Sequence, residues 1–363
     1  MTRLLAASSP GEVRVAAIVD GVLQDYAIWR PGRPDGVGDV YRARVIAHVP
    51  GMAGAFVSLP DGDGFLPDSE GGAKAVGGAL VTVRVTRAAQ GGKGARVSAK
   101  VAQMMGEPGL VTAGPSPVAE LAERYPDASI EVDDPALAVE LQPALKRVIT
   151  IVPGALAPFA EAIDGLSDTE IALPAGMRAS IHPTPALVAI DLDMAAATAD
   201  RGGKKRTQMA ANLAAIPALV RQIRLRNLSG AILIDPAGIS VKRRELLAPA
   251  LTEALAADPL GARLVGFTGL GLVEIQRVRR RPALHELLEG AHAAGLSALR
   301  AMVRECMAAP SATMRLAAAP DVVAALERDT VARADLVRRV GRALIARPDP
   351  ALAPGGWRIE RVA

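Results

Sequence analysis

Two strand-like segments of this chain each end in carboxylates, and this feature constrains the fold more than any other. The run ALVAIDLDMAAAT at 186–198 is apolar until Asp191 and Asp193, and the run GAILIDPAG at 230–238 is apolar until Asp235. A basic, amphipathic segment lies between the two runs and predicts a helix. Strand, helix and strand in this order predict a βαβ unit with a right-handed connection.

These acids are expected to lie together at one edge of a sheet. Residues two apart in a strand point to the same face, so Asp191 and Asp193 should project together. If the two strands are parallel neighbours, Asp235 lies at the same carboxyl edge, where open α/β sheets place their sites. The alternative, in which each Asp only ends a strand or caps the next helix, stays open on this pattern.

Clustered carboxylates indicate a particular kind of ligand. Like charges a few Å apart raise each other's pKa, so the cluster needs a cation to stay ionised. Oxygen ligands without a nearby Cys or His favour Mg²⁺, with Mn²⁺ as the alternative, over zinc. Such an ion can activate water and neutralise a phosphoryl oxygen, as hydrolysis of a phosphodiester requires.

Length, charge and cysteine content exclude several classes of protein. The 363 residues suffice for two or three domains with sizeable cores. No stretch approaches the roughly 18 to 20 apolar residues that span a bilayer, and the N-terminus lacks the apolar core of a signal peptide. We therefore expect a soluble, cytoplasmic protein. The single Cys306 excludes an internal disulfide and a multi-thiolate zinc site, and the net charge of +4 permits a polyanionic partner without requiring one.

The pattern along the chain predicts several modules. Residues 13–30 indicate two strands around an Asp-Gly turn, and a breaker-rich link follows at 31–38. Between 38 and 98 five short strands separated by glycine-rich turns are typical of a small closed barrel of the OB type. Residues 115–185 then alternate helical and strand-like pieces, as α/β proteins do.

The predicted barrel carries aromatic and cationic side chains that suit single-stranded nucleic acid. Phe56 and Phe65 are two of only four Phe in the chain, and Lys93 and Arg96 lie in the turn QGGKGAR. Aromatic rings beside cations on a barrel face form a stacking platform for bases. The alternative is that both Phe side chains belong to the barrel core.

Three ordered motifs resemble the bacterial ribonuclease E/G family. They are ALVAIDLDMAAAT, RLRNLSGAILIDP and GFTGLGLVEIQRVRRRPALHELL. The segment GDVYRARVIAHVPGMAGAFVSLPDGDGFLP and the turn QGGKGARVS are similar to that family's inserted RNA-binding barrel. The final GGWRIERV resembles the end of its small C-terminal domain.

The resemblance implies a mixed α/β, multidomain architecture. It consists of a ribonuclease-H-like part, an inserted OB-fold RNA-binding domain, a deoxyribonuclease-I-like nuclease part with the metal site, and a small C-terminal α/β domain. The ribonuclease-H-like part would cover 1–37 and a shortened 100–185, and the inserted barrel would cover 38–99. The nuclease part would cover 186–290, and the C-terminal domain would cover 291–363.

The resemblance also implies an activity. Asp191 and Asp235 would be the Mg²⁺ ligands of an endoribonuclease that cuts single-stranded RNA by metal-activated water. The products would carry a 5′-phosphate and a 3′-hydroxyl, and the reaction would serve RNA processing or decay. The alternative is an RNA-binding protein on the same scaffold that has lost cleavage.

Four further residues fall on RNA-binding positions of the family. Phe56, Phe65 and Lys93 match the barrel residues that hold RNA, and Arg277 matches the Arg after the G-L-x-E turn. The dense cluster of arginines that begins at Arg277 could hold an RNA backbone through its charge.

Two departures from the family pattern bear on the metal site. Asp193 stands where the family has Asn, whose amide can donate a hydrogen bond that a carboxylate cannot. Asp193 is therefore either an extra ligand and candidate catalytic residue or a perturbation. Gly238 stands where the family often has another acid, which puts the strength of the metal site in question.

Two family elements are absent from the sequence. The Cys-Pro-x-Cys zinc link that joins subunits is missing, and His285 and His292 are better explained as surface residues than as ligands. We therefore expect neither zinc nor a zinc-bridged dimer, and the oligomeric state stays open. The 5′-end sensing segment is mostly missing as well, and no membrane partner is expected.

Overall fold

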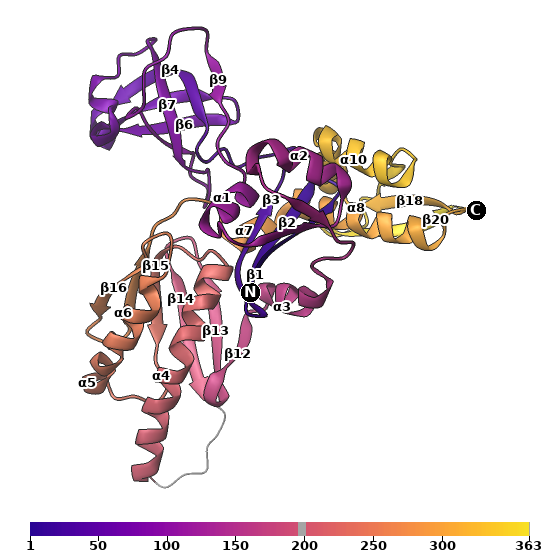
Figure 1. The fold of residues 1–363 in the computed structure, drawn as a ribbon. Coiled ribbons are helices and arrows are strands. Elements are labelled where there is room, and N and C mark those ends of the chain that lie inside the picture. The colour runs from indigo at the N-terminus through magenta and orange to yellow at the C-terminus, as the bar shows by residue number, and fades with distance from the viewer. Residues whose placement is uncertain (195–200, 363) are drawn as a thin grey trace. The chain divides into compact units, whose positions relative to one another are not determined.

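The computed structural model describes residues 1–194 and 201–362 and forms two compact units (Figure 1). Unit 1 consists of Met1–Gly36, Pro115–Phe159 and His285–Ala363, and unit 2 of Val37–Gly114 and Ala160–Leu284. The last four residues of the motif at 186–198 lie outside the described part. Among the described residues, no helix combines the length and the apolar character that a membrane crossing requires. The architecture is mixed α/β with several domains, as predicted.

The first sheet of unit 1 has the strand order β11-β10-β1-β2-β3. Its strands are β1 Thr2–Ser9, β2 Glu12–Val19, β3 Val22–Trp29, β10 Ser129–Val132 and β11 Ile149–Ile151. Strand β10 runs parallel to β1 and β11, whereas β2 and β3 are antiparallel. Asp20 and Gly21 both have positive φ between β2 and β3, which confirms the predicted hairpin and its turn.

Helices cover this sheet on its apolar face. They are α1 Pro117–Arg124 and α2 Pro135–Leu145, whereas the short helix α3, Ala160–Asp164, is part of unit 2. The side chains of Ser116 and Asp134 accept hydrogen bonds from backbone N–H groups in the first turns of α1 and α2, so both helices begin at a conventional N-cap. Apolar residues of α1 and α2, among them Val118 and Leu141, pack on Val15 and Ile130 of the sheet.

A small three-stranded sheet of order β19-β18-β20 completes unit 1. Its strands are β18 Thr313–Ala318, β19 Ala346–Pro348 and β20 Trp357–Val362, and the helices around it are α8 Gly290–Ala308, α9 Pro320–Arg328 and α10 Thr330–Val340. The short helix α7, Leu284–Leu288, precedes them in the chain. Leu299, Leu316 and Val322, from α8, β18 and α9, lie in one buried cluster. This part therefore has a core of its own.

Unit 2 begins with a closed five-stranded barrel. Its strands are β4 Val40–Val49, β5 Gly54–Leu59, β6 Gly62–Pro67, β7 Leu80–Arg87 and β8 Arg96–Ser98. They follow the order β5-β6-β8-β7-β4, and the pairing of β4 with β5 closes the barrel. Strand β9, Gly109–Thr112, adds to β4 from outside the ring. The structure thus confirms the predicted small barrel.

A six-stranded mixed sheet of order β12-β13-β14-β15-β17-β16 forms the rest of unit 2. Its strands are β12 Glu170–Leu173, β13 Met177–Pro183, β14 Val188–Met194, β15 Gly230–Asp235, β16 Arg263–Phe267 and β17 Val273–Arg277. The helices are α4 Arg201–Leu225, α5 Val241–Arg244 and α6 Ala248–Ala256. Strands β14 and β15 are parallel neighbours joined through α4, which confirms the predicted βαβ unit.

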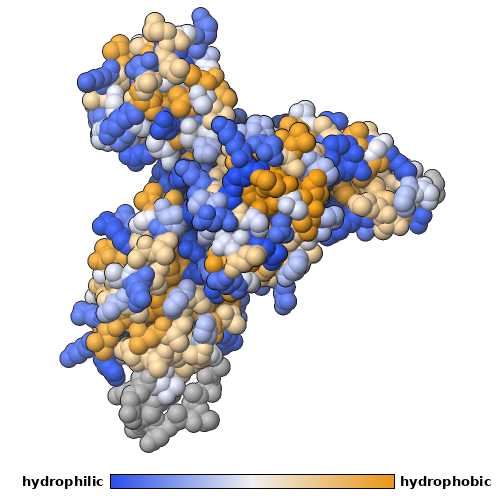
Figure 2. Space-filling model, viewed as in Figure 1, coloured by the Kyte–Doolittle hydropathy of each residue, from blue (hydrophilic) through white to orange (hydrophobic). Residues whose placement is uncertain are grey.

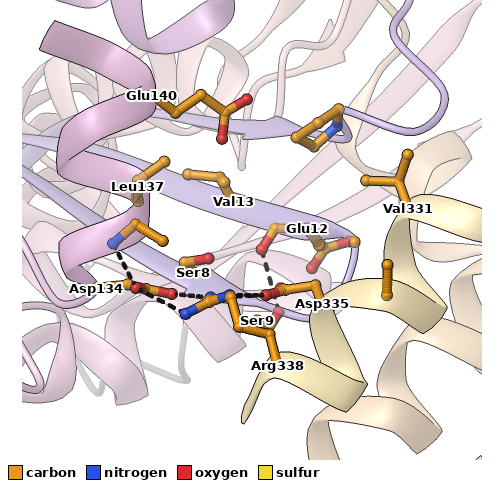
Figure 3. A pocket seen from close by; sticks show the side chains of 14 residues that line it. Ser8, Ser9, Glu12, Val13, Asp134, Leu137, Glu140, Val331, Asp335 and Arg338 are labelled. Atoms are coloured by element: carbon orange, nitrogen blue, oxygen red, sulfur yellow. Dashed lines mark hydrogen bonds and ion pairs between the residues drawn. The ribbon is translucent and has the colours of Figure 1, made fainter. Parts of the chain in front are cut away.

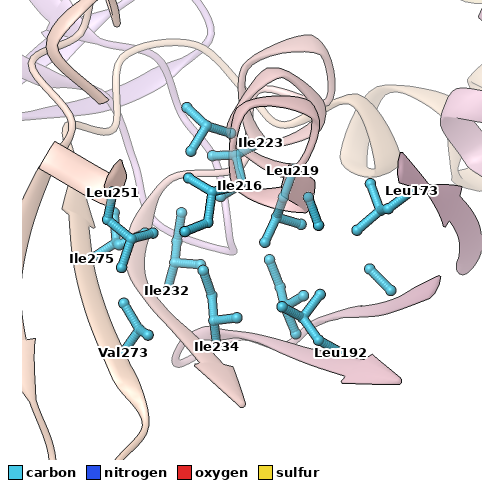
Figure 4. Packing of buried hydrophobic residues seen from close by; sticks show 14 of the residues in the cluster. Leu173, Leu192, Ile216, Leu219, Ile223, Ile232, Ile234, Leu251, Val273 and Ile275 are labelled. Atoms are coloured by element: carbon cyan, nitrogen blue, oxygen red, sulfur yellow. The ribbon is translucent and has the colours of Figure 1, made fainter. Parts of the chain in front are cut away.

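The core of this sheet lies on one face only. Figure 4 shows apolar side chains of α4, such as Ile216 and Leu219, over Ile232 and Ile234 of β15. Side chains of the opposite sheet face are exposed, as Asp191 is, or half-buried, as Leu233 and Asp235 are. The alternation of the strands therefore separates a buried apolar face from an open polar face.

Candidate active site at a parallel strand pair

Asp191 and Asp235 are register partners on the two parallel strands β14 and β15. Adjacent strands lie about 4.8 Å apart, so the two carboxylates start from neighbouring backbone positions. Ile190 and Ile234 precede them and are buried in the core, which places both acids on the open face. The predicted convergence at the carboxyl edge is confirmed.

The two carboxylates differ in what they contact. Asp191 is exposed and has no hydrogen bond or ion pair within the described residues. Asp235 keeps 49% of its side chain exposed, yet its Oδ1 atom is buried and accepts no hydrogen bond. The Arg244 guanidinium lies 2.8 Å from that oxygen without hydrogen-bond alignment. The Asp191 carboxylate is therefore free to accept a cation, whereas the Oδ1 of Asp235 already faces the charge of Arg244.

Arg244 is fixed in place by backbone carbonyl groups. Its Nε donates to the Ile239 carbonyl at 2.9 Å, and its Nη1 donates to the Gly271 carbonyl at 3.0 Å. Only 13% of the side chain is exposed. Arg244 therefore connects the loop after β15 to the loop before β17 and places a fixed positive charge beside Asp235.

A buried asparagine holds the loop that follows Asp235. Asn212 of α4 is 1% exposed. Its Nδ2 donates to the Gln208 carbonyl at 2.8 Å and to the Ala237 carbonyl at 3.0 Å, and its Oδ1 accepts from the Ala237 N–H at 3.1 Å. Two of these bonds cross from helix to loop, so Asn212 fixes the backbone two residues beyond the carboxylate.

Gly238 lies in the same loop and has a structural reason to be glycine. Its φ is +64°, and a Cβ built on it would lie 2.1 Å from the Nε2 of Gln208. An acid at this position would need both a strained backbone and a displaced Gln208. The fold of this loop therefore requires glycine at position 238.

Asp193 has contacts of its own. The Arg178 Nη2 lies 3.2 Å from its Oδ2, and its Oδ1 accepts from the Met194 N–H at 2.7 Å. Within residues 1–194 and 201–362, no group of three or more His, Cys, Asp or Glu side chains is arranged to hold a metal. The site consequently presents a carboxylate pair, with the third acid engaged by a neighbouring strand.

The predicted RNA-binding residues of the barrel lie on its outside. Phe56 and Phe65 are cross-strand partners on β5 and β6, with ring centroids 5.5 Å apart and planes inclined by 60°. Their neighbours Ala55 and Leu66 point into the core, whereas both Phe rings are only half-buried. Lys93 is exposed in the turn between β7 and β8. Hydrophobic and hydrophilic side chains lie together on the barrel face drawn in Figure 2.

Arg277 is placed differently from the other expected RNA-binding residues. Its side chain is 2% exposed. Its Nε donates to Asp258 at 2.8 Å, and its Nη1 donates to the Asn227 side chain at 2.8 Å and to the Leu228 carbonyl at 3.1 Å. The guanidinium is committed inside the fold, which disfavours the expected contact with RNA and indicates a structural role.

Unit 1 contains a second group of acids around a cavity of about 390 Å³ (Figure 3). Asp134 accepts hydrogen bonds from both Arg338 and Arg339, and Asp335 also pairs with both arginines. Burial, followed by the charge of Asp335, raises the pKa of Glu140 above its ordinary value. Most of this negative charge is neutralised within the fold, unlike that of Asp191.

The strand pair falls within the part of the chain that matches known proteins. Residues 142–280 match the model of the "Ribonuclease E/G family". The chain is similar to this family over those residues. It is 36% identical over 126 residues to ribonuclease E of Escherichia coli strain K12, a match that covers 34% of this chain and 12% of that protein.

Two ribonucleases G show similar agreement with this chain. The Haemophilus influenzae protein is 33% identical over 128 residues, which are 35% of this chain and 26% of that protein. The protein of Escherichia coli strain K12 is 33% identical over 123 residues, which are 33% of this chain and 25% of that protein. Each match therefore spans about a quarter or less of the relative's length.

The sequence patterns did not point to Arg244 or Asn212. Asn212 left one weak signal, because a polar residue interrupts the apolar side of a predicted helix. Arg244 lies in the charged run VKRRE and resembles any exposed helix end. Only the three-dimensional contacts connect these two residues with Asp235.

Proposed function

We propose that this chain is a divalent-metal-dependent endoribonuclease that cuts single-stranded RNA. The observation that carries the proposal is the register pair of Asp191 and Asp235, whose carboxylates accept no hydrogen bond among the described residues and lie in the stretch that matches the ribonuclease E/G family. The relatives named ribonuclease E and ribonuclease G support the choice of RNA as substrate.

Asp191 and Asp235 would hold Mg²⁺, with Mn²⁺ as the alternative. The pair fits such an ion because its donors are carboxylate oxygens, one of which is buried without a hydrogen bond. The bound ion would activate water and neutralise a phosphoryl oxygen, and the products would carry a 5′-phosphate and a 3′-hydroxyl. Arg244 restrains the Asp235 carboxylate, and Asn212 restrains the backbone behind it.

The barrel would supply binding of the single strand. Two adjacent, half-exposed rings offer stacking surfaces for bases, and the exposed Lys93 can contact a phosphate. As part of the same proposal, the barrel is of the OB type, the sheet of unit 2 is the deoxyribonuclease-I-like part, and the first sheet of unit 1 is ribonuclease-H-like.

Cleavage of a labelled, A/U-rich single-stranded RNA tests this function. We expect the purified chain to cut with Mg²⁺ and to stop cutting with EDTA. Asp191→Asn and Asp235→Asn should each lower the cleavage rate at least about 100-fold, because loss of a metal ligand lowers activity at least as much as loss of a residue that supports a ligand. Asp164→Asn removes an exposed carboxylate of unit 2 and should cut normally.

The competing function is RNA binding without cleavage. Tight binding with no cutting under either Mg²⁺ or Mn²⁺ would support it and overturn the nuclease. The observations that would then explain the loss are the engagement of Asp193 by Arg178 and the glycine at 238.

A further inference from the structure

One row of side chains crosses four neighbouring strands on the outside of the barrel. Phe56 of β5 is the register partner of Phe65 of β6, Phe65 is the partner of Arg96 of β8, and Arg96 is the partner of Arg87 of β7. With strands about 4.8 Å apart, the row is about 14 Å long. It places two aromatic side chains directly beside two arginines.

The row faces outward. Val57, Leu66 and Val97 directly follow Phe56, Phe65 and Arg96 and are buried in the barrel core, so these three row residues lie on the other side of each pleat. Arg96 is exposed and Arg87 is half-buried. Phe56, Phe65 and Arg96 are therefore available to a ligand that lies across the barrel, and Arg87, which follows a register shift in β7, keeps part of its side chain exposed.

The cationic end of the row has positive neighbours and few acids. The Ala88 N–H donates to the Arg280 carbonyl at 2.9 Å, which brings the segment of Arg279 next to the end of β7 in the same unit. Burial, followed by the charges of Arg96 and Arg279, lowers the pKa of Arg87. The Nε atom of Arg87 is buried without an acceptor, and its Nη2 donates to the Gly94 carbonyl at 3.2 Å.

Carboxylates do not relieve this repulsion. In the described part of the chain, none of these three arginines has an ion pair with a carboxylate within 4 Å. Glu70 is an acid that interacts electrostatically with Arg96. Its carboxylate already accepts hydrogen bonds from Ser98 at 2.6 Å and from Lys100 at 3.0 Å. Mutually repelling cations are stabilised when a polyanion binds to them.

We propose that Arg87, Arg96 and Arg279 form the phosphate-binding half of an RNA platform whose base-stacking half is the Phe56–Phe65 pair. The inference rests on the proposed function, which makes single-stranded RNA the ligand. Bases stack on the two rings while the backbone runs past the guanidinium groups, the combination that single-stranded nucleic acids require. The platform thus extends beyond the Phe and Lys positions to a cationic half.

The experiment is fluorescence anisotropy of a labelled single-stranded RNA in EDTA, which prevents cleavage, over a series of salt concentrations. Arg96→Gln and Arg279→Gln should each bind about tenfold more weakly, as expected for loss of one charged hydrogen bond. Each should also lower the slope of log affinity against log salt by about 0.7, the value for one phosphate contact on a single strand.

Two further variants separate charge from folding. Arg361→Gln removes the same side chain from an exposed position of β20 in unit 1 and should leave both affinity and slope unchanged. Arg96→Lys keeps the charge and should restore most of the slope. Thermal unfolding of each variant checks that the barrel remains folded.

The outcomes distinguish this inference from the function on which it rests. If the unaltered chain binds RNA and the Arg96→Gln and Arg279→Gln variants keep its affinity and slope, the cationic half is overturned and the proposed function stands. If the unaltered chain neither binds nor cuts RNA, the proposed function fails and the platform fails with it.

Discussion

Glu12 of unit 1 and Asp191 of unit 2 are carboxylates in opposite surroundings. In unit 1 the Glu12 side chain is 1% exposed and lies between Arg30 at 2.9 Å and Arg300 at 3.0 Å, with Arg14 at 3.0 Å as well. In unit 2 Asp191 is exposed and has no partner among the described residues. The charge of Glu12 is used within the fold, whereas the charge of Asp191 remains available to a ligand.

The pKa of Glu12 reflects this use. Burial alone would raise the pKa, because a carboxylate loses its hydration inside the protein. The charges of Arg30, Arg300 and Arg14, together with the Arg14 hydrogen bond, outweigh burial and hold the pKa below its ordinary value of 4.5. The ionised form is therefore the one that stabilises unit 1.

The largest effect on stability should come from Glu12→Gln. The substitution leaves three arginines around a neutral side chain, and breaking a buried ion pair costs about 3–5 kcal/mol. Urea unfolding should show a loss of this size, while Glu123→Gln, an exposed acid of α1, should show almost none. A loss below about 1 kcal/mol would contradict the view that this charge supports the fold.

The same variant has a defined pH dependence. Because the folded-state pKa of Glu12 is lowered, its stabilisation is fully present above the unfolded value of 4.5 and is lost as the pH falls through the folded value. The difference in unfolding free energy between the unaltered chain and Glu12→Gln should therefore shrink below pH 4.5. A difference in unfolding free energy that stays constant below pH 4.5 would contradict the lowered pKa of Glu12.

Asn212→Ala should have an intermediate effect and links the stability of unit 2 to its site. It leaves the Ala237 N–H and carbonyl without their partners, which costs about 1–3 kcal/mol. Since the affected loop follows Asp235, RNA cleavage should also fall when measured well below the unfolding temperature. Leu213→Ala, at the exposed neighbouring position, is the control. Normal cleavage by Asn212→Ala would show that Asn212 does not position the site.

Asp193→Asn should have the smallest effect. Its ion pair with Arg178 is exposed on both sides, and such pairs contribute about 0–1 kcal/mol. We expect almost unchanged stability and metal affinity, because the carboxylate is engaged by the neighbouring strand. A loss of cleavage as large as that of Asp191→Asn would instead make Asp193 a ligand, and the carboxylate pair would become a triad.

The sequence predicted those features that depend on local alternation and turn chemistry. The hairpin at Asp20 and Gly21 follows from a two-residue turn, and the small barrel follows from short strands between glycine-rich turns. The meeting of Asp191 and Asp235 follows from the topology of a single βαβ unit. Each inference needed only the period of a strand and the order of neighbouring elements.

Features that depend on contacts between distant segments could not be predicted in this way. Arg277 lies in a strongly basic run and was expected on the surface, but its pairing with Asp258 and Asn227 buries it. The row from Phe56 to Arg87 depends on which strands are neighbours in the closed barrel, since β8 lies between β6 and β7. Sequence spacing contains no direct signal for that order.

Binding of Mn²⁺, followed by its electron paramagnetic resonance signal, tests the central contrast most directly. The unaltered chain and Asp164→Asn should bind the ion alike, whereas Asp191→Asn and Asp235→Asn should each bind it at least about tenfold more weakly, because each removes one carboxylate of the pair. Equal binding by all four proteins would contradict the account, because the strand-end carboxylates would then have no role in holding a cation.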